Sequence, residues 1–314
     1  MLQILSITIP IYLIIGLGFV AARWQLFAQP DMRALSRFVV NFCLPALLFR
    51  ALSQRRLGEV FDGVYLLAYA LGSLLVLLGA TACIRLLRGK PMPLAALHGL
   101  GMAGSNSAFI GYPIALQLLG PAAGVALALT MVVENLMVLP LALVLADSSS
   151  ALRWDRALLQ SLRGLLRNPM ILAIIAGVAF ALSGLQLPDT LARTIQIVAG
   201  AASPVALFVI GGSLVGLRLQ GLHADIAIVV TGKLLLHPLA VFALLWLLPP
   251  LDAELRAAAV VYACMPMLSI YPLLAQKYQA ESFSAAALLV ATVASFATIT
   301  AWLAVLHSVL NWTD

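Results

Sequence analysis

The stretch "SNSAFIGYP", residues 105–113, places three polar residues, a glycine and a proline in the middle of an apolar segment. That segment runs from Pro93 to Leu119 and is long enough to cross a bilayer, which takes about 20 apolar residues. Proline lacks an N–H and clashes with the preceding turn, so we expect the helix to break at Pro113. Non-helical backbone at membrane depth is tolerated only where it is buried in protein or lines a wet cavity. The stretch therefore predicts a broken membrane helix that frames a binding site.

The composition excludes a soluble protein. The chain has 314 residues, of which 63% are hydrophobic and 10% charged, with a mean hydropathy of +1.07. Soluble domains are about half apolar and a quarter charged. The three cysteines lie in apolar segments without the spacing of a metal site. We therefore expect a polytopic membrane protein without a metal or cofactor, and the net charge of +6 gives no indication of nucleic-acid binding.

Charged clusters, glycines and prolines divide the chain into ten predicted transmembrane helices. They lie at approximately 2–22, 35–52, 63–84, 94–118, 121–146, 169–184, 191–216, 223–247, 255–275 and 283–308. A polar linker at 147–168 separates the fifth from the sixth, and its Leu and Trp spacing predicts a short amphipathic helix on the membrane surface. Of the 18 Lys and Arg residues, twelve fall in loops on the linker's side and five on the other. The positive-inside rule then predicts a cytoplasmic linker, both termini outside, and location in the inner (plasma) membrane.

The two halves of the chain repeat each other at an offset of 159 residues. Three proline pairs keep this offset: Pro10 and Pro169, Pro45 and Pro204, and Pro113 and Pro272. Glycine, phenylalanine and tyrosine pairs follow it too: Gly18 and Gly177, Phe49 and Phe208, and Tyr112 and Tyr271. Each half holds five predicted spans, so residues 1–146 and 169–314 should enter the membrane from opposite sides. Inverted repeats with broken helices are typical of secondary transporters, and here "CMPMLSIYP" (264–272) predicts the second break.

Two ionisable residues lie in the middle of predicted spans, where charges are rare and usually functional. Glu134, followed by Asn135, lies in the fifth span, and Lys233 lies in the eighth. In one interpretation Lys233 is the counter-ion of a substrate anion, directly or through neighbouring groups. Glu134 is then a protonatable group or part of a cation site, and its charge state is coupled to loading. In the other, the two side chains form an ion pair that fastens the helices. The sequence leaves both open.

Several motifs resemble the auxin efflux carrier family, which includes the plant PIN auxin exporters and bacterial organic-acid carriers. The motifs are "RFVVNFCLPALLF" (37–49), "NSAFIGYPI" (106–114), "LLRNPMI" (165–171), "ASPVALFVIGGSL" (202–214), "KLLLHPL" (233–239) and "ACMPMLSIYPLLAQKY" (263–278). The resemblance implies carboxylate substrates and an elevator mechanism. Helices 1, 2, 6 and 7 would be a scaffold, with a homodimer contact through helices 2 and 7. Helices 3–5 and 8–10 would be the transport domain, crossing at broken helices 4 and 9.

The resemblance also implies residue roles. Asn106 matches the family's substrate-binding asparagine, and Pro113 and Pro272 match its crossover prolines. The predicted site, with Glu134 and Asn135 as coupling residues, contains Leu44, Pro45, Ser105, Asn106, Ser107, Tyr112, Pro113, Lys233, Met265, Ile270, Tyr271 and Pro272.

The sequence thus predicts a secondary transporter of small organic carboxylates, and the short linker favours the malonate or dicarboxylate carriers of the family. A proton, or Na⁺, is the expected coupling ion. Two alternatives remain: a sodium-coupled symporter of the bile-acid type, and an exporter of auxin-like monocarboxylates. No nucleotide-binding loop and no nucleophile–base pair occurs within the spans, so we do not expect an enzyme.

Overall fold

The computed structural model describes residues 2–54, 62–147, 167–216 and 223–310. Within these ranges the chain is helical and contains no strand. Most of the predicted linker and its surface helix lie outside the described residues.

The first half consists of long helices, several of which contain a five-residue π-helical turn, labelled η. Its elements are α1 (Leu2–Arg23), α2 (Gln29–Phe38), η1 (Val39–Cys43), α3 (Leu44–Ser53), α5 (Gly63–Leu87), α6 (Met92–Ala103), η2 (Ser107–Gly111), α7 (Tyr112–Leu119), α8 (Ala122–Val133), η3 (Glu134–Val138) and α9 (Leu139–Asp147).

The second half has a similar series. Its elements are α11 (Pro169–Ser183), α12 (Asp189–Gly200), α13 (Ala202–Ser213), α14 (His223–Thr231), η4 (Gly232–Leu236), α15 (His237–Leu247), α16 (Ala253–Ala263), α17 (Tyr271–Gln276) and α18 (Glu281–Leu310).

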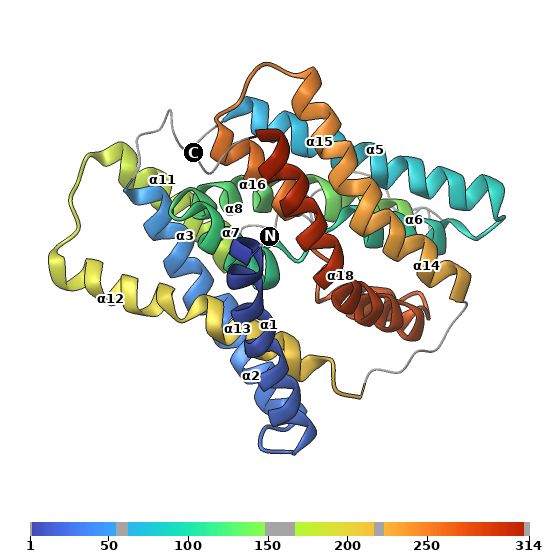
Figure 1. The fold of residues 1–314 in the computed structure, drawn as a ribbon, viewed down its shortest axis with the longest axis horizontal. Helices are drawn as coiled ribbons and strands as arrows, with labels where there is room; N and C mark the ends of the chain where they lie inside the picture. Colours follow the sequence, from blue (N-terminus) through green and yellow to red (C-terminus); the bar gives the residue numbers. More distant parts are fainter. Residues whose placement is uncertain (1, 55–61, 148–166, 217–222, 311–314) are drawn as a thin grey trace.

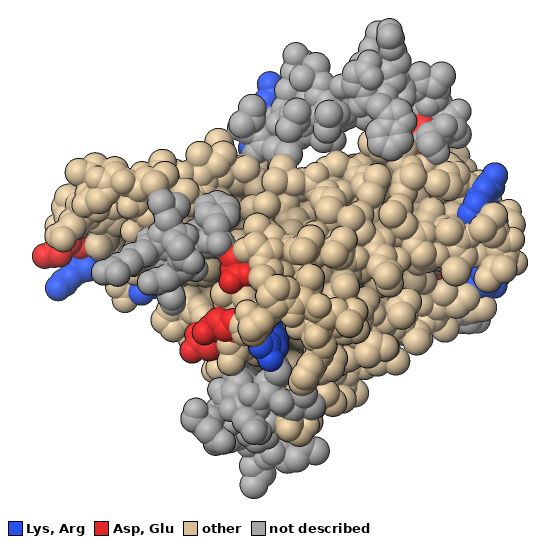
Figure 2. Space-filling model, turned by 90° about the horizontal axis from the view of Figure 1, so that it is seen from above, with Lys and Arg blue, Asp and Glu red and all other residues tan. Residues whose placement is uncertain are grey.

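The helices have the length and surface of a membrane protein. Among the described residues, six continuous helices are long and apolar enough to cross a bilayer: 29–53, 63–87, 122–147, 189–213, 224–247 and 281–306. Ile9–Arg23 and Pro169–Ser183 are shorter apolar helices. Large apolar side chains point outward, Leu247 with 80% of its surface exposed. Figure 2 shows a broad uncharged face with Lys, Arg, Asp and Glu confined to a few places. These features support a multi-pass membrane protein.

Each of the four π-helical turns is followed, two residues after its end, by a proline. These prolines are Pro45, Pro113, Pro140 and Pro238. Proline removes one helical hydrogen bond and crowds the carbonyl four residues earlier, and a wider turn relieves this conflict without ending the helix. π-turns of this kind are frequent at functional sites. Here they carry Ser107, Glu134 and Lys233.

The helices gather in two groups (Figure 1). One group contains α1, α2, α3, α11, α12 and α13, the other contains α5, α6, α14, α15 and α18, and α7 and α8 lie between them. In the first group α1 packs mainly on α13, and α11 mainly on α3.

The same glycine contact occurs in both of those helix pairs. A Cβ on Gly18 would lie 2.0 Å from the carbonyl oxygen of Phe208, and one on Gly177 would lie 3.1 Å from that of Phe49. The two glycines and the two phenylalanines are the pairs related by 159 residues. The absence of a side chain lets each helix pair approach closely.

Candidate functional site

Two helices are interrupted, and the interruptions touch. α6 ends at Ala103 and η2 begins at Ser107, while α16 ends at Ala263 and α17 begins at Tyr271. The Asn106 backbone N–H donates to the carbonyl oxygen of Pro266 at 2.8 Å, and its side-chain Nδ2 donates to Ser269 Oγ at 2.7 Å. Asn106 therefore holds the two interruptions together.

The first break lies earlier than the sequence predicted. Residues 104–106 are non-helical, whereas Pro113 lies inside the following helical segment, at the start of α7. The π-turn η2 accommodates the proline, and Tyr112 N–H bonds to the carbonyl of Ser107, five residues back. In the second half Pro272 directly follows the break at 264–270, as expected for a residue suited to a first helical turn.

Glu134 opens η3 and turns one of its two oxygens to the first break. Its Oε1 accepts hydrogen bonds from Ser105 N–H at 3.1 Å, Ser107 Oγ at 3.0 Å and the Tyr69 hydroxyl at 3.1 Å. Its Oε2 is buried without a hydrogen-bond partner. Only 3% of the residue surface is exposed. A buried carboxylate oxygen without a partner is costly, so this oxygen is available to a proton, a cation or a ligand donor.

Lys233 lies on the other side of Ser105 and is fully buried. Its Nζ donates to Ser105 Oγ at 2.6 Å and to the Ala263 carbonyl at 3.0 Å, and it lies 2.7 Å from His237 Nδ1. With Nδ1 of His237 as the unprotonated ring nitrogen, these three partners accept all three hydrogens of the ammonium group. His237 continues the network, because its Nε2 lies 3.0 Å from Ser73 Oγ.

Glu134 and Lys233 are linked through Ser105. In the part of the chain that the structure describes, no ion pair joins the two side chains. The Ser105 backbone N–H donates to Glu134, while its hydroxyl accepts from Lys233. Both interpretations of these residues therefore need Ser105 as an intermediary.

Glu134 also lines a cavity of about 220 Å³. Its polar lining residues are Ser105, Asn106, Ser107, Glu134, Asn135, Asn168 and Ser269, and its apolar lining includes Val40, Phe109, Met131, Met170, Leu268 and Ile270. Ser107, Ala108 and Phe109 begin the half-helix η2–α7, whose first N–H groups have no carbonyl above them and carry partial positive charge. Of the lining residues that the structure describes, Glu134 alone has a charged side chain.

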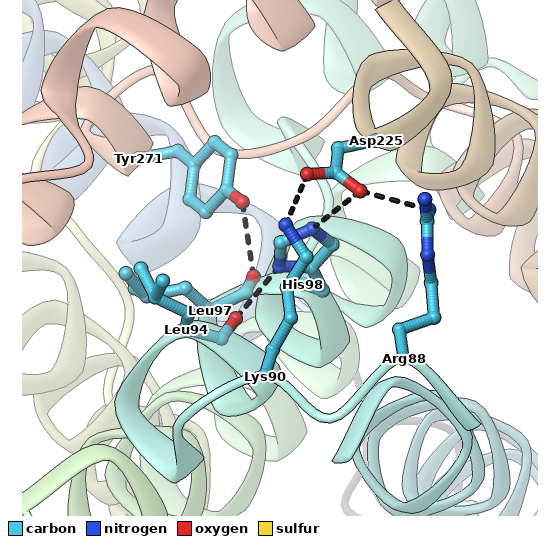
Figure 3. Close-up of polar contacts among 7 residues, drawn as sticks. All are labelled: Arg88, Lys90, Leu94, Leu97, His98, Asp225 and Tyr271. Carbon is cyan, nitrogen blue, oxygen red and sulfur yellow. Dashed lines mark hydrogen bonds and ion pairs between the residues drawn. The ribbon is translucent and has the colours of Figure 1, made fainter. Parts of the chain in front are cut away.

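The structure brings part of the predicted site together. Ser105, Asn106, Ser107, Glu134, Asn135 and Ile270 line the cavity. The other predicted residues do not line it: Leu44, Pro45, Tyr112, Pro113, Lys233, Met265, Tyr271 and Pro272. The π-turn before α3 contributes Val40, one turn before Leu44. Tyr271 faces α6, where its hydroxyl donates to the Leu97 carbonyl at 3.0 Å (Figure 3).

Sequence reasoning missed three polar residues of the site. Asn168 and Ser269 lie within the quoted motifs "LLRNPMI" and "CMPMLSIYP", and both line the cavity. Tyr69 lies in α5, and only its contact with Glu134 reveals it. A hydroxyl in a uniformly apolar helix with no proline nearby gives little signal in one sequence.

The chain is similar to known membrane transporters over nearly all of its length. It matches the family described as "Membrane transport protein" over residues 4–303. It is 31% identical to the "Putative malonate transporter" of Rhizobium meliloti (strain 1021), over 98% of this chain and 97% of the relative. It is 26% identical to the "Uncharacterized transporter YfdV" of Escherichia coli (strain K12), over 74% of this chain and 75% of the relative. It is also 26% identical to an "Uncharacterized transporter" of Methanothermobacter thermautotrophicus, over 73% of this chain and 74% of the relative.

Proposed function

Because the chain belongs to the membrane transport protein family, the auxin efflux carrier family, we propose that it is a secondary active transporter of small organic carboxylate anions. The name of the Rhizobium meliloti relative supports malonate, or a dicarboxylate of similar size, as the preferred substrate. The cavity of about 220 Å³ also favours a small acid, because pockets for drug-sized ligands hold about 300–1,000 Å³. The family consists of transporters, which favours a carrier over an enzyme.

The observation that carries the proposal is Glu134, whose Oε2 is buried without a partner and which lines a cavity where the other described polar residues are neutral. An ionised Glu134 repels an incoming carboxylate. A protonated Glu134 instead donates a hydrogen bond from Oε2 to that carboxylate. The first N–H groups of η2 and the polar groups of Asn106 and Ser269 then bind the remaining oxygens. Substrate and proton therefore load together.

Lys233 sets the charge balance without contacting the substrate. Its three donors are occupied by Ser105, His237 and Ala263. When Glu134 takes up a proton, the positive charge of Lys233 is no longer balanced nearby. In the low dielectric of a buried site this favours an anion in the cavity. Lys233 is thus a positioning and charge-balancing residue, with Ser105 as its link to the cavity.

Alternating access occurs by an elevator motion of one helix group against the other. We assign α1–α3 and α11–α13 to the scaffold, and α5–α9 and α14–α18 to the transport domain. The matching glycine contacts of Gly18 on Phe208 and Gly177 on Phe49 support an inverted repeat of five spans in each half. The touching interruptions at Asn106 and Ser269 support crossing of the broken helices. Exposed apolar side chains on the outer helices, such as Phe42 and Ile197, suit a homodimer contact.

The carrier resides in the inner membrane with both termini outside and residues 147–168 in the cytoplasm. The Lys and Arg distribution supports this orientation. Asn168, the last residue of the linker and the N-cap of α11, lines the cavity and suggests access from the cytoplasmic side.

The test is uptake of radiolabelled malonate into proteoliposomes with imposed pH or Na⁺ gradients. The wild type should accumulate malonate in response to a pH gradient. The Asn106→Ala variant should take up malonate more slowly than the wild type. Asn41→Ala is the control, because Asn41 is exposed and bonds only to its own helix, at the Arg37 carbonyl. Accumulation driven by Na⁺ alone would favour the bile-acid symporter alternative. Transport of indole-3-acetate but not malonate would favour the auxin-like alternative.

A further inference from the structure

A second, larger cavity lies on the outside of the molecule and shares no lining residue with the cavity of the candidate site. It has a volume of about 780 Å³ and runs between α5 and the continuous helix α14–η4–α15. Leu75 and Ile84 lie at its two ends on α5, and Ala227 and Leu239 at its two ends on the facing helix. Thr231 is the one hydroxyl-bearing residue that lines it, so its wall is almost entirely apolar. We call this cavity the outer groove.

The outer groove has the depth of one bilayer leaflet. Leu75 to Ile84 spans nine helical steps, about 14 Å at 1.5 Å per residue. Half of the hydrocarbon core is about 15 Å. Leu75 lies at the middle of α5 and Ile84 lies close to its end at Leu87, so the groove runs from mid-membrane to the interface.

Basic residues surround the interfacial end of the outer groove. Arg85 and Arg88 follow Ile84 on α5, and Lys90 follows in the next loop. Asp225 of α14 pairs with Arg88 at 2.8 Å and with Lys90, and His98 Nε2 approaches it at 3.9 Å (Figure 3). Arg85 is exposed and donates to the Lys90 carbonyl. Three permanent cations against one acid leave this end positively charged.

We propose that the outer groove binds an acyl chain of an anionic phospholipid, whose phosphate is held by Arg85 and Arg88. The leaflet-length apolar wall fits a single lipid chain, and the basic end complements the headgroup. By the distribution of Lys and Arg this end faces the cytoplasm, where the leaflet is rich in anionic lipids. A second copy of the chain would bury the apolar wall but would have no need for the basic end.

The floor of the outer groove adjoins the candidate site. Met102 and Gly232 both line it. A Cβ on Gly232 would lie 2.5 Å from Met102 Sδ, so the two helices meet closely there. Met102 is two residues before the first break at Gly104, and Gly232 directly precedes Lys233. A lipid chain in the outer groove therefore packs against Met102 and Gly232, which lie next to the first break and Lys233.

The first test is native mass spectrometry of the purified protein titrated with phosphatidylglycerol, phosphatidylethanolamine of the same chains, and glycerol phosphate. Gly79→Trp fills the outer groove, because a Cβ on the exposed Gly79 meets open space. Gly16→Trp on α1 is the matched control, as Gly16 is also exposed and open but lies elsewhere. Phosphatidylglycerol binding should fall in Gly79→Trp and persist in Gly16→Trp.

Arg85→Gln should weaken phosphatidylglycerol binding about fivefold and leave phosphatidylethanolamine binding unchanged, since one basic residue at the surface contributes about that factor. Arg33→Gln on α2 should change neither.

The second test uses the native thiol of Cys83, which lines the outer groove and is exposed, while Cys43 and Cys264 are buried. Phosphatidylglycerol should slow alkylation of Cys83 in the wild-type protein. The proposal is overturned if Gly79→Trp retains the lipid as well as Gly16→Trp does. It is also overturned if glycerol phosphate competes as well as the intact lipid, or if Gly79→Trp abolishes a dimer without changing lipid binding.

Discussion

Glu134 and Asp225 are both buried acids, and their surroundings differ in kind. Asp225 is bonded through both oxygens, to Arg88 and to Lys90. Glu134 bonds only neutral donors through Oε1, its Oε2 has no partner, and the residue lines a cavity. A fully paired acid fastens two elements together, here the loop after α5 and the start of α14. An acid with one free oxygen at a cavity is suited to bind a proton or ligand. Burial alone therefore does not distinguish a structural acid from a functional one. The hydrogen-bond partners of each carboxylate oxygen do distinguish them.

The largest expected effect on transport is that of Lys233→Met. Hydrogen bonds to charged groups contribute about 1.5–3 kcal/mol each, so loss of the Ser105 link alone should reduce malonate uptake by roughly 10- to 150-fold. Lys277→Met is the control, because Lys277 is 65% exposed and its pair with Asp147 is a surface pair. Exposed pairs contribute about 0–1 kcal/mol, so uptake should change little. If malonate uptake falls equally in Lys233→Met and Lys277→Met, the buried hydrogen-bond network of Lys233 has no specific role in transport.

Asn106→Ala should raise the KM for malonate by about tenfold. The side chain joins the two interruptions through Ser269 and lines the cavity, and a hydrogen bond contributes about 1 kcal/mol or somewhat more. Initial rates of uptake over a range of malonate concentrations measure this change. If the KM of Asn106→Ala equals that of the control Asn41→Ala, the substrate does not bind at Asn106.

Asp225→Asn should change stability rather than transport. The variant loses charge-assisted bonds to Arg88 and Lys90, of which Arg88 is one-third exposed and can reach water. A cost of about 2 kcal/mol follows, and the apparent Tm should fall by roughly 3 °C. Uptake per folded molecule should stay within about twofold of wild type, given a surviving fold. If Asp225→Asn loses malonate uptake while its Tm is unchanged, Asp225 takes part in transport, and the distinction between Asp225 and Glu134 is wrong.

Asn168→Ser should have the smallest effect. Asn168 caps α11 by accepting from Met170 N–H, and serine preserves this function. The longer reach of Nδ2 toward Asn135 Oδ1, 3.4 Å away, is lost. A weak neutral hydrogen bond of this kind is worth about 0.5 kcal/mol, so KM should rise by about two- to threefold at unchanged Tm. A tenfold change would bring Asn168 into direct contact with the substrate.

The sequence predicted the membrane class, the family and an all-helical chain. It did so because hydropathy, proline positions and the 159-residue offset are properties of one chain read along its length. The interruption before Pro113 was misplaced because a single sequence does not reveal that a π-turn lets a helix continue through proline. The two interruptions meet at Asn106 and Pro266, and that contact depends on folding.

The candidate site was predicted only in part, for a related reason. Ser105, Asn106 and Glu134 were identifiable as polar residues out of place in apolar helices, and all line the cavity. Which of them face the cavity depends on side-chain direction. Lys233 points into a network that satisfies all its donors, and Tyr271 points to α6. Tyr69 reaches Glu134 from a helix far away in the sequence, so no local pattern identifies it.

The most direct test of the central claim, that Glu134 Oε2 carries the coupling proton, is a comparison of two transport modes in Glu134→Gln. Glutamine keeps an oxygen for Ser105 and Ser107 and mimics the protonated acid, but it cannot release a proton. We expect malonate–malonate exchange across proteoliposomes to persist while accumulation driven by a pH gradient is lost. Accumulation at the wild-type level in Glu134→Gln would contradict it and place the coupling ion elsewhere.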